Sequence, residues 1–168
     1  MTPVLTALGD WLHATALGRA AAGGVPWLWA ACETLHFIGL ALLIGCVTVL
    51  DLRMLGVAKG LPLAPLQRLM PYAVLGFLIN LATGVTFFAG APDQYTDNGA
   101  FHLKILFIAL AGANVALFYV SGVAKRIDAL GAGEDAPVLA KMVAATSLFL
   151  WIGVMYWGRM LPFLGDAF

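Results

Sequence analysis

The sequence predicts an all-α integral membrane protein, a four-transmembrane-helix bundle with an N-terminal interfacial amphipathic helix and both termini outside the cytoplasm. Hydrophobic residues make up 62% of its 168 residues and charged residues only 11%, whereas soluble domains carry about 25% charged residues. Apolar stretches of about 20 residues, the length that crosses a bilayer, recur four times along the chain. We therefore expect one membrane domain over residues 1–168, with the lipid bilayer as its main partner.

The individual elements follow from the positions of apolar residues, prolines and glycines. Residues 4–22 mix apolar side chains with Asp10, His13 and Arg19, which is too polar for a span and suits a helix lying on the membrane surface. Pro71 either begins the second span or kinks a short lead-in helix away from it. The four spans are expected at residues 27–50, 69–90, 101–122 and 138–160.

Lysine and arginine residues predict the orientation, because short cytoplasmic loops of membrane proteins are enriched in them. The loops after the first and third spans are basic, and the loop after the second span is acidic. The basic residues are Arg53, Lys59, Arg68, Lys125, Arg126 and Lys141, and the acidic ones are Asp93 and Asp97. Both basic loops are expected to face the cytoplasm. Since nine Lys and Arg balance nine Asp and Glu, we expect no surface for nucleic acid.

The first span carries a carboxylate and an imidazole in an otherwise apolar helix. Glu33 and His36 are three residues apart, so on a helix they share one face, together with Gly39. An ionisable side chain near the bilayer centre costs at least about 2.5 kcal/mol, so its default interpretation is a functional site facing the bundle interior. The plainer alternative is that His36 only forms a hydrogen bond with Glu33 or with Asn80 of the second span.

A b-type haem explains this pattern best. The predicted topology places all three histidines on the outer side and leaves the inner half of the bundle with almost nothing ionisable. His36 and His102, on separate spans, are the candidate axial ligands. His36 lies roughly 14 Å deep and His102 only a few Å deep when rise is counted at about 1.5 Å per residue, so ligation by His36 alone stays open. The candidate residues around the haem are Gly39 for space, Glu33 as a hydrogen-bond partner, and Lys104 and Arg159 for the propionates.

The same histidines support two other interpretations. His36, His102 and His13 would suit copper or another transition metal, and the protein would then be a metal-binding or copper-uptake protein. A structural or assembly subunit, in which the polar residues only join helices, is the third alternative. Small residues on the second and third spans allow a homodimer without requiring one.

Short motifs in the first and third spans carry a resemblance to known families. The segments Leu35-His36-Phe37-Ile38-Gly39 and Phe101-His102-Leu103-Lys104-Ile105-Leu106 resemble the copper-resistance D type membrane proteins and the haem-containing bacterial membrane protoporphyrinogen oxidases. The pattern Glu33-Thr34-x-His36-x-x-Gly39, followed by Asp51-Leu52-Arg53-x-Leu55-Gly56, is similar to small uncharacterised bacterial four-helix families related to them. The resemblance implies a multi-pass protein of the bacterial cytoplasmic (inner) membrane with haem b, a redox or haem-handling role and an unknown redox partner. A membrane oxidoreductase is one form of that role.

Overall fold

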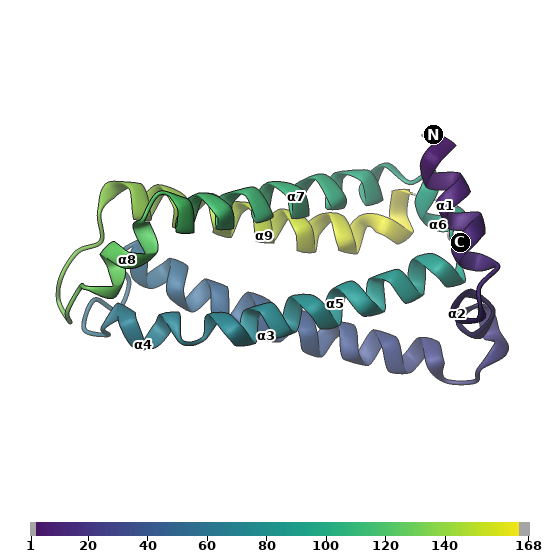
Figure 1. The fold of residues 1–168 in the computed structure, drawn as a ribbon, viewed down its shortest axis with the longest axis horizontal. Helices are drawn as coiled ribbons and strands as arrows, with labels where there is room; N and C mark the ends of the chain where they lie inside the picture. Colours follow the sequence, from purple (N-terminus) through teal and green to yellow (C-terminus); the bar gives the residue numbers. More distant parts are fainter. Residues whose placement is uncertain (1–2, 165–168) are drawn as a thin grey trace.

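Four long helices make up most of the computed structural model, which describes residues 3–164 and has no strand among them (Figure 1). They are α3 (Leu28–Met54), α5 (Met70–Gly90), α7 (Gly99–Val120) and α9 (Val138–Leu164). Each is long and apolar enough to cross a membrane, the second together with its lead-in helix. This confirms the predicted all-α bundle with four candidate membrane spans. The first two and last four residues of the predicted domain 1–168 lie outside the described part.

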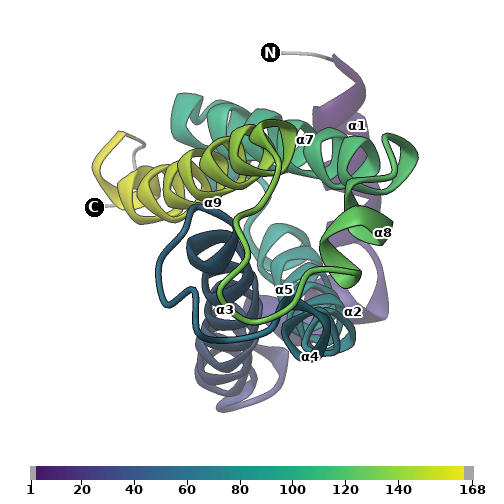
Figure 2. The same ribbon diagram turned by 90° about the vertical axis from the view of Figure 1, so that its left-hand side faces the viewer.

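The four helices pack as two antiparallel pairs, α3 with α5 and α7 with α9, and the pairs meet mainly where α3 contacts α9 (Figure 2). Glycines let α3 and α5 approach closely. A Cβ added at Gly76 would lie 2.5 Å from the carbonyl oxygen of Gly39, so the two backbones touch there. Small residues at such crossings allow tight packing in membranes. A Cβ at Gly84, about two turns further along α5, would meet no atom within 4 Å.

Short helices close the two ends of the bundle (Figure 1). The end that we call the α1 end carries α1 (Pro3–His13), α2 (Ala16–Arg19), a π-helical turn (Ala20–Gly24) and α6 (Asp93–Thr96). The opposite end, the α8 end, carries α4 (Leu63–Gln67) and α8 (Val123–Asp128). The described chain begins and finishes at the α1 end, as an even number of spans requires.

Several element boundaries differ from the prediction. The surface helix expected over residues 4–22 is divided, because Thr15 accepts a 3.2 Å hydrogen bond from the Gly18 N–H and starts a new helix. Pro71 lies in the first turn of α5, directly after the short lead-in helix α4. The first span continues to Met54 instead of Leu50, and the last continues to Leu164 instead of Met160. The first extension matters most, because it brings Asp51 and Arg53 into the helix.

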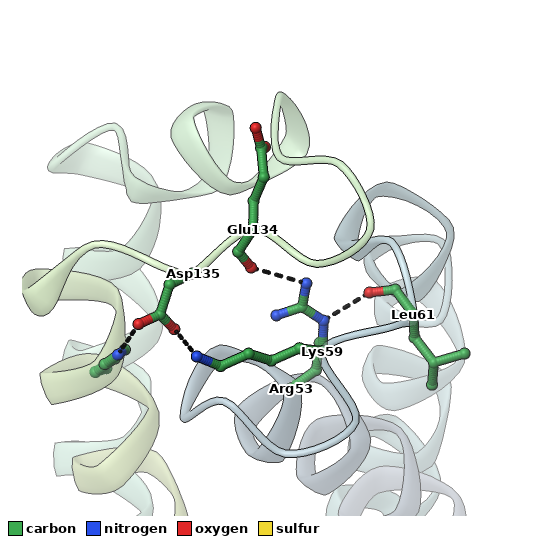
Figure 3. Close-up of polar contacts among 6 residues, drawn as sticks. Arg53, Lys59, Leu61, Glu134 and Asp135 are labelled. Carbon is green, nitrogen blue, oxygen red and sulfur yellow. Dashed lines mark hydrogen bonds and ion pairs between the residues drawn. The ribbon is translucent and has the colours of Figure 1, made fainter.

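Arg53 holds the loops of the α8 end together (Figure 3). Its side chain is 1% exposed; its Nε donates to the Leu61 carbonyl at 2.6 Å and its Nη2 to the Glu134 carbonyl at 3.1 Å. Beside it, the exposed Asp135 pairs with Lys59 at 3.2 Å and with Lys141 at 2.7 Å. These hydrogen bonds, from Lys141 first and then Lys59, lower the pKa of Asp135. The loop after the first span is thereby joined to the loop before the last.

Candidate functional site

His36 is held in one orientation by the neighbouring helix. It is half-buried on α3, and its Nδ1 lies 2.7 Å from Oγ1 of Thr83 on α5. The Thr83 hydroxyl lies 2.8 Å from the Ile79 carbonyl oxygen, with the Asn80 carbonyl as a second acceptor at 3.2 Å. A hydroxyl has one hydrogen, and the Thr83 hydroxyl donates its hydrogen to one of these two carbonyls. The Thr83 oxygen then accepts a hydrogen bond from the N–H at Nδ1 of His36. In neutral His36 the lone pair is then on Nε2, the atom that remains for a ligand.

An aromatic ring lies next to His36 on the side of the α1 end, with a second ring behind it. The Phe87 ring lies 5.6 Å from the imidazole, centroid to centroid, and Trp29 lies 4.9 Å from Phe87. All three side chains belong to the α3–α5 pair, which therefore supplies one apolar wall beside the imidazole.

Lys104 contributes a positive charge from the other helix pair. It is half-buried on α7 and its Nζ lies 3.6 Å from the position of a Cβ added at Gly158 on α9, so the glycine leaves room for the lysine. Within residues 3–164, the ion pairs found are those of Asp135, and none involves Lys104. An anionic group at the α1 end would give this ammonium a partner.

Glu33 and Gly39 are two of the residues predicted around the haem, and neither is the hydrogen-bond partner of His36. Glu33 is exposed, and its charge acts on Tyr95 of α6, where burial first and Glu33 second raise the pKa of the phenol. Gly39 is buried and faces Asn80 and Gly76, so the space at this glycine is filled by α5. Asn80 itself donates to the Gly76 carbonyl at 2.9 Å. Thr83, which the prediction did not name as a partner, takes the hydrogen bond of His36.

The contacts of the other candidate residues are with groups other than His36. His102 is exposed on α7 with its ring 6.3 Å from Phe101, and Arg159 is exposed with its guanidinium 5.4 Å from the Phe163 ring. His13 lies at the end of α1, where its Nδ1 is 2.9 Å from the Ala89 carbonyl oxygen. Over residues 3–164, no three His, Cys, Asp or Glu side chains gather closely enough to hold a metal ion.

A second polar position lies toward the α8 end, where the sequence predicted almost no ionisable group. Asp51 is 4% exposed and lines a cavity of about 280 Å³ between the helix pairs, together with Asn114 and Ser147. Helical periodicity indicates that Asp51 faces the bundle interior. Asp51 is four residues beyond Val47, and Val47 is four beyond Leu43, so all three share one face once the helix continues past Leu50.

Comparison with known proteins places the chain in a family without giving it a function. No curated protein matches it, and no solved structure matches it. One family model, described as a family of unknown function, matches residues 9–164. Because this match covers nearly all of the chain, the protein belongs to that family, DUF6644.

Proposed function

We propose that this protein binds a b-type haem at the α1 end of the bundle, with Nε2 of His36 as an axial ligand, and has a redox or haem-handling role in the bacterial inner membrane. The observation that carries the proposal is the hydrogen bond between Nδ1 of His36 and Oγ1 of Thr83. Imidazoles that ligate a metal are commonly fixed through the other ring nitrogen, which sets the tautomer and makes the ligand more basic.

The grouping of side chains favours haem over a bare metal ion. Protein sites for transition-metal ions usually take three or four side-chain ligands, and residues 3–164 offer no such group of His, Cys, Asp and Glu. A haem needs only one or two protein ligands, because the porphyrin supplies four nitrogens of its own. His36 alone is sufficient for one axial position, and His102 is our candidate for the other.

Charge supports the same location. Lys104, half-buried and without an ion pair in the described part of the chain, would pair with a propionate. Arg159 near the end of α9 is a second cation on that side. Lys59, Arg68, Lys125 and Arg126 all belong to the α8 end. By the positive-inside rule we expect the α8 end to face the cytoplasm and the haem to lie in the outer half of the bilayer.

An absorption spectrum of the detergent-purified protein, oxidised and then reduced, tests the proposal. We expect a Soret band that sharpens on reduction, is lost in His36→Ala and is retained in the matched control His13→Ala, whose histidine bonds to a helix end. The His102→Ala spectrum tests the second ligand, since loss of a six-coordinate ferric spectrum would identify His102. Colourless protein after expression with ample haem would contradict the proposal. Elemental analysis for copper and zinc then separates the metal-binding alternative from a structural subunit.

A further inference from the structure

The cavity beside Asp51 is separate from the proposed haem position and lies between the two helix pairs. Residues from all four long helices line it, and its volume is about 280 Å³. Its walls are mostly apolar, with aromatic rings from α5, α7 and α9; these are Phe77, Phe118, Tyr119 and Trp151. Binding sites for small molecules typically combine apolar walls of this kind with a few polar groups that orient the ligand.

Asp51 supplies an unpaired carboxylate oxygen in this cavity. The residue is 4% exposed, and its Oδ2 has no hydrogen-bond partner in the structure. No ion pair joins Asp51 to Arg53 within residues 3–164. Residues two apart on a helix do not face each other; Arg53 donates its Nε and Nη2 to the carbonyls of Leu61 and Glu134, and its Nη1 has no partner. Buried polar atoms normally have partners, so each exception needs an explanation such as a bound molecule.

The other polar groups of the cavity are also able to accept hydrogen bonds. Asn114 donates its Nδ2 to the Val143 carbonyl at 3.1 Å, which leaves its Oδ1 as an acceptor. Ser147 lies beside Asp51; its hydroxyl donates its hydrogen to the carboxylate, and the hydroxyl oxygen can still accept. A cavity with a carboxylate, an amide oxygen and a hydroxyl is complementary to a cation with several N–H donors.

We propose that this cavity binds a small primary amine in its ammonium form, with an aromatic or branched apolar body against the rings and its charge on Asp51. An engineered cavity of about 150 Å³ accommodates benzene, so one nearly twice as large suits a bicyclic body. An ammonium has three donors, which matches the three acceptors, and aromatic walls attract a cation further. The inference does not depend on haem, since it uses no residue of the haem proposal.

Tryptamine is a suitable probe, with 3-ethylindole as the same molecule without the amine. Binding is measured by equilibrium dialysis against the full chain in nanodiscs of zwitterionic lipid, with empty nanodiscs as the background. We expect saturable binding of one tryptamine per chain and binding of 3-ethylindole that is at least about tenfold weaker, because a charged hydrogen bond is lost. Asp51→Asn keeps the shape of the side chain and should lose about tenfold or more in tryptamine affinity. Asp97→Asn, which removes an exposed carboxylate, should keep it.

A second variant is needed in case Asp51→Asn fails to fold. Gly112 borders the cavity, and a Cβ added there meets no atom within 4 Å, so Gly112→Leu should narrow the space with the carboxylate intact. We expect it to weaken tryptamine binding with an unchanged melting temperature. Equal binding of 3-ethylindole and tryptamine, insensitive to Asp51→Asn, would mean that the cavity holds an acyl chain and would overturn the proposal. Absence of saturable binding would overturn it too. His36→Ala should leave tryptamine binding unchanged. The failure of the amine proposal can therefore be distinguished from the failure of the haem proposal.

Discussion

His36 and Thr83 join α3 to α5 by a hydrogen bond of 2.7 Å between residues 47 positions apart in the chain. The bond lies one to two turns from the contact of Gly39 with Gly76, where the same two helices have their backbones together. The close backbone contact fixes the distance between the helices, and the hydrogen bond then fixes the imidazole. A rigid pair of helices is therefore the support of the proposed ligand.

Thr83→Val tests this support directly. Valine has nearly the same shape but cannot accept from Nδ1 of His36, and loss of such an outer partner commonly costs 10- to 100-fold in metal affinity. We expect the affinity for haem to fall at least about tenfold. The affinity is measured by titrating purified protein with haem and following the Soret band. Thr83→Ser keeps the hydroxyl and should keep the affinity. Equal haem binding by the valine variant would show that the hydrogen bond does not support a ligand.

Gly76→Ala should destabilise the bundle. Its Cβ would lie 2.5 Å from the Gly39 oxygen and 2.7 Å from the Leu43 nitrogen, and backbone atoms cannot turn aside as a side chain can. We expect the free energy of unfolding to fall by about 1–3 kcal/mol, measured by denaturant titration in detergent. Gly84→Ala, on the same helix with open space around it, is the matched control and should be neutral or stabilising. Similar losses in both variants would refute the close contact.

Arg53→Met should loosen the α8 end. The substitution leaves the Leu61 and Glu134 carbonyls without their donor, and hydrogen bonds to a charged group contribute about 1.5–3 kcal/mol each. We expect a lower melting temperature and faster protease cleavage between residues 129 and 136. Arg53→Lys should restore only part of the stability, because an ammonium cannot reproduce the guanidinium fork. The control is Arg68→Met, at an exposed position, and cleavage at the same rate in both methionine variants would contradict the role of Arg53.

Asp135 predicts a small dependence of stability on pH. Lys141 and Lys59 lower its pKa below the ordinary value of 3.8, so the folded state favours the ionised carboxylate. The resulting stabilisation is present above pH 4 and is lost as the pH falls through the lowered pKa. Because the group is exposed, the effect should be small and weakened by salt. Melting temperatures of wild type and Asp135→Asn should differ near pH 7 and converge at low pH; a difference that grows on acidification would have the wrong sign.

Cysteine labelling tests the orientation. The native Cys32 and Cys46 are free and are first replaced by alanine. A cysteine at Lys59, at the α8 end, should then react with a membrane-impermeant maleimide only after the inner membrane is opened. A cysteine at Asp97, beside α6 at the α1 end, should react in intact spheroplasts. The reverse pattern would place the proposed haem position on the cytoplasmic side.

Much of the fold could be predicted because hydropathy and helical periodicity depend on neighbouring residues in the chain. The four long apolar helices follow from that local pattern. The prediction of the surface helix was less accurate. Thr15 caps the N-terminus of a new helix and divides the segment, and a pattern of apolar residues does not reveal such a cap.

Contacts between helices follow from the rotation and depth of each helix, and these depend on how whole surfaces pack. Packing of Gly39 on Gly76 brings Thr83, instead of Glu33 or Asn80, to His36. Arg53 was expected in a loop, but α3 continues to Met54 and includes it. The buried Arg53 side chain donates hydrogen bonds to the Leu61 and Glu134 carbonyls. The same extension puts Asp51 inside the bundle. Composition and periodicity therefore determine that this chain forms four helices long and apolar enough to span a membrane, with a histidine in the first of them. The partners of His36 and Arg53 and the burial of Asp51 depend on segments that meet only when the helices pack.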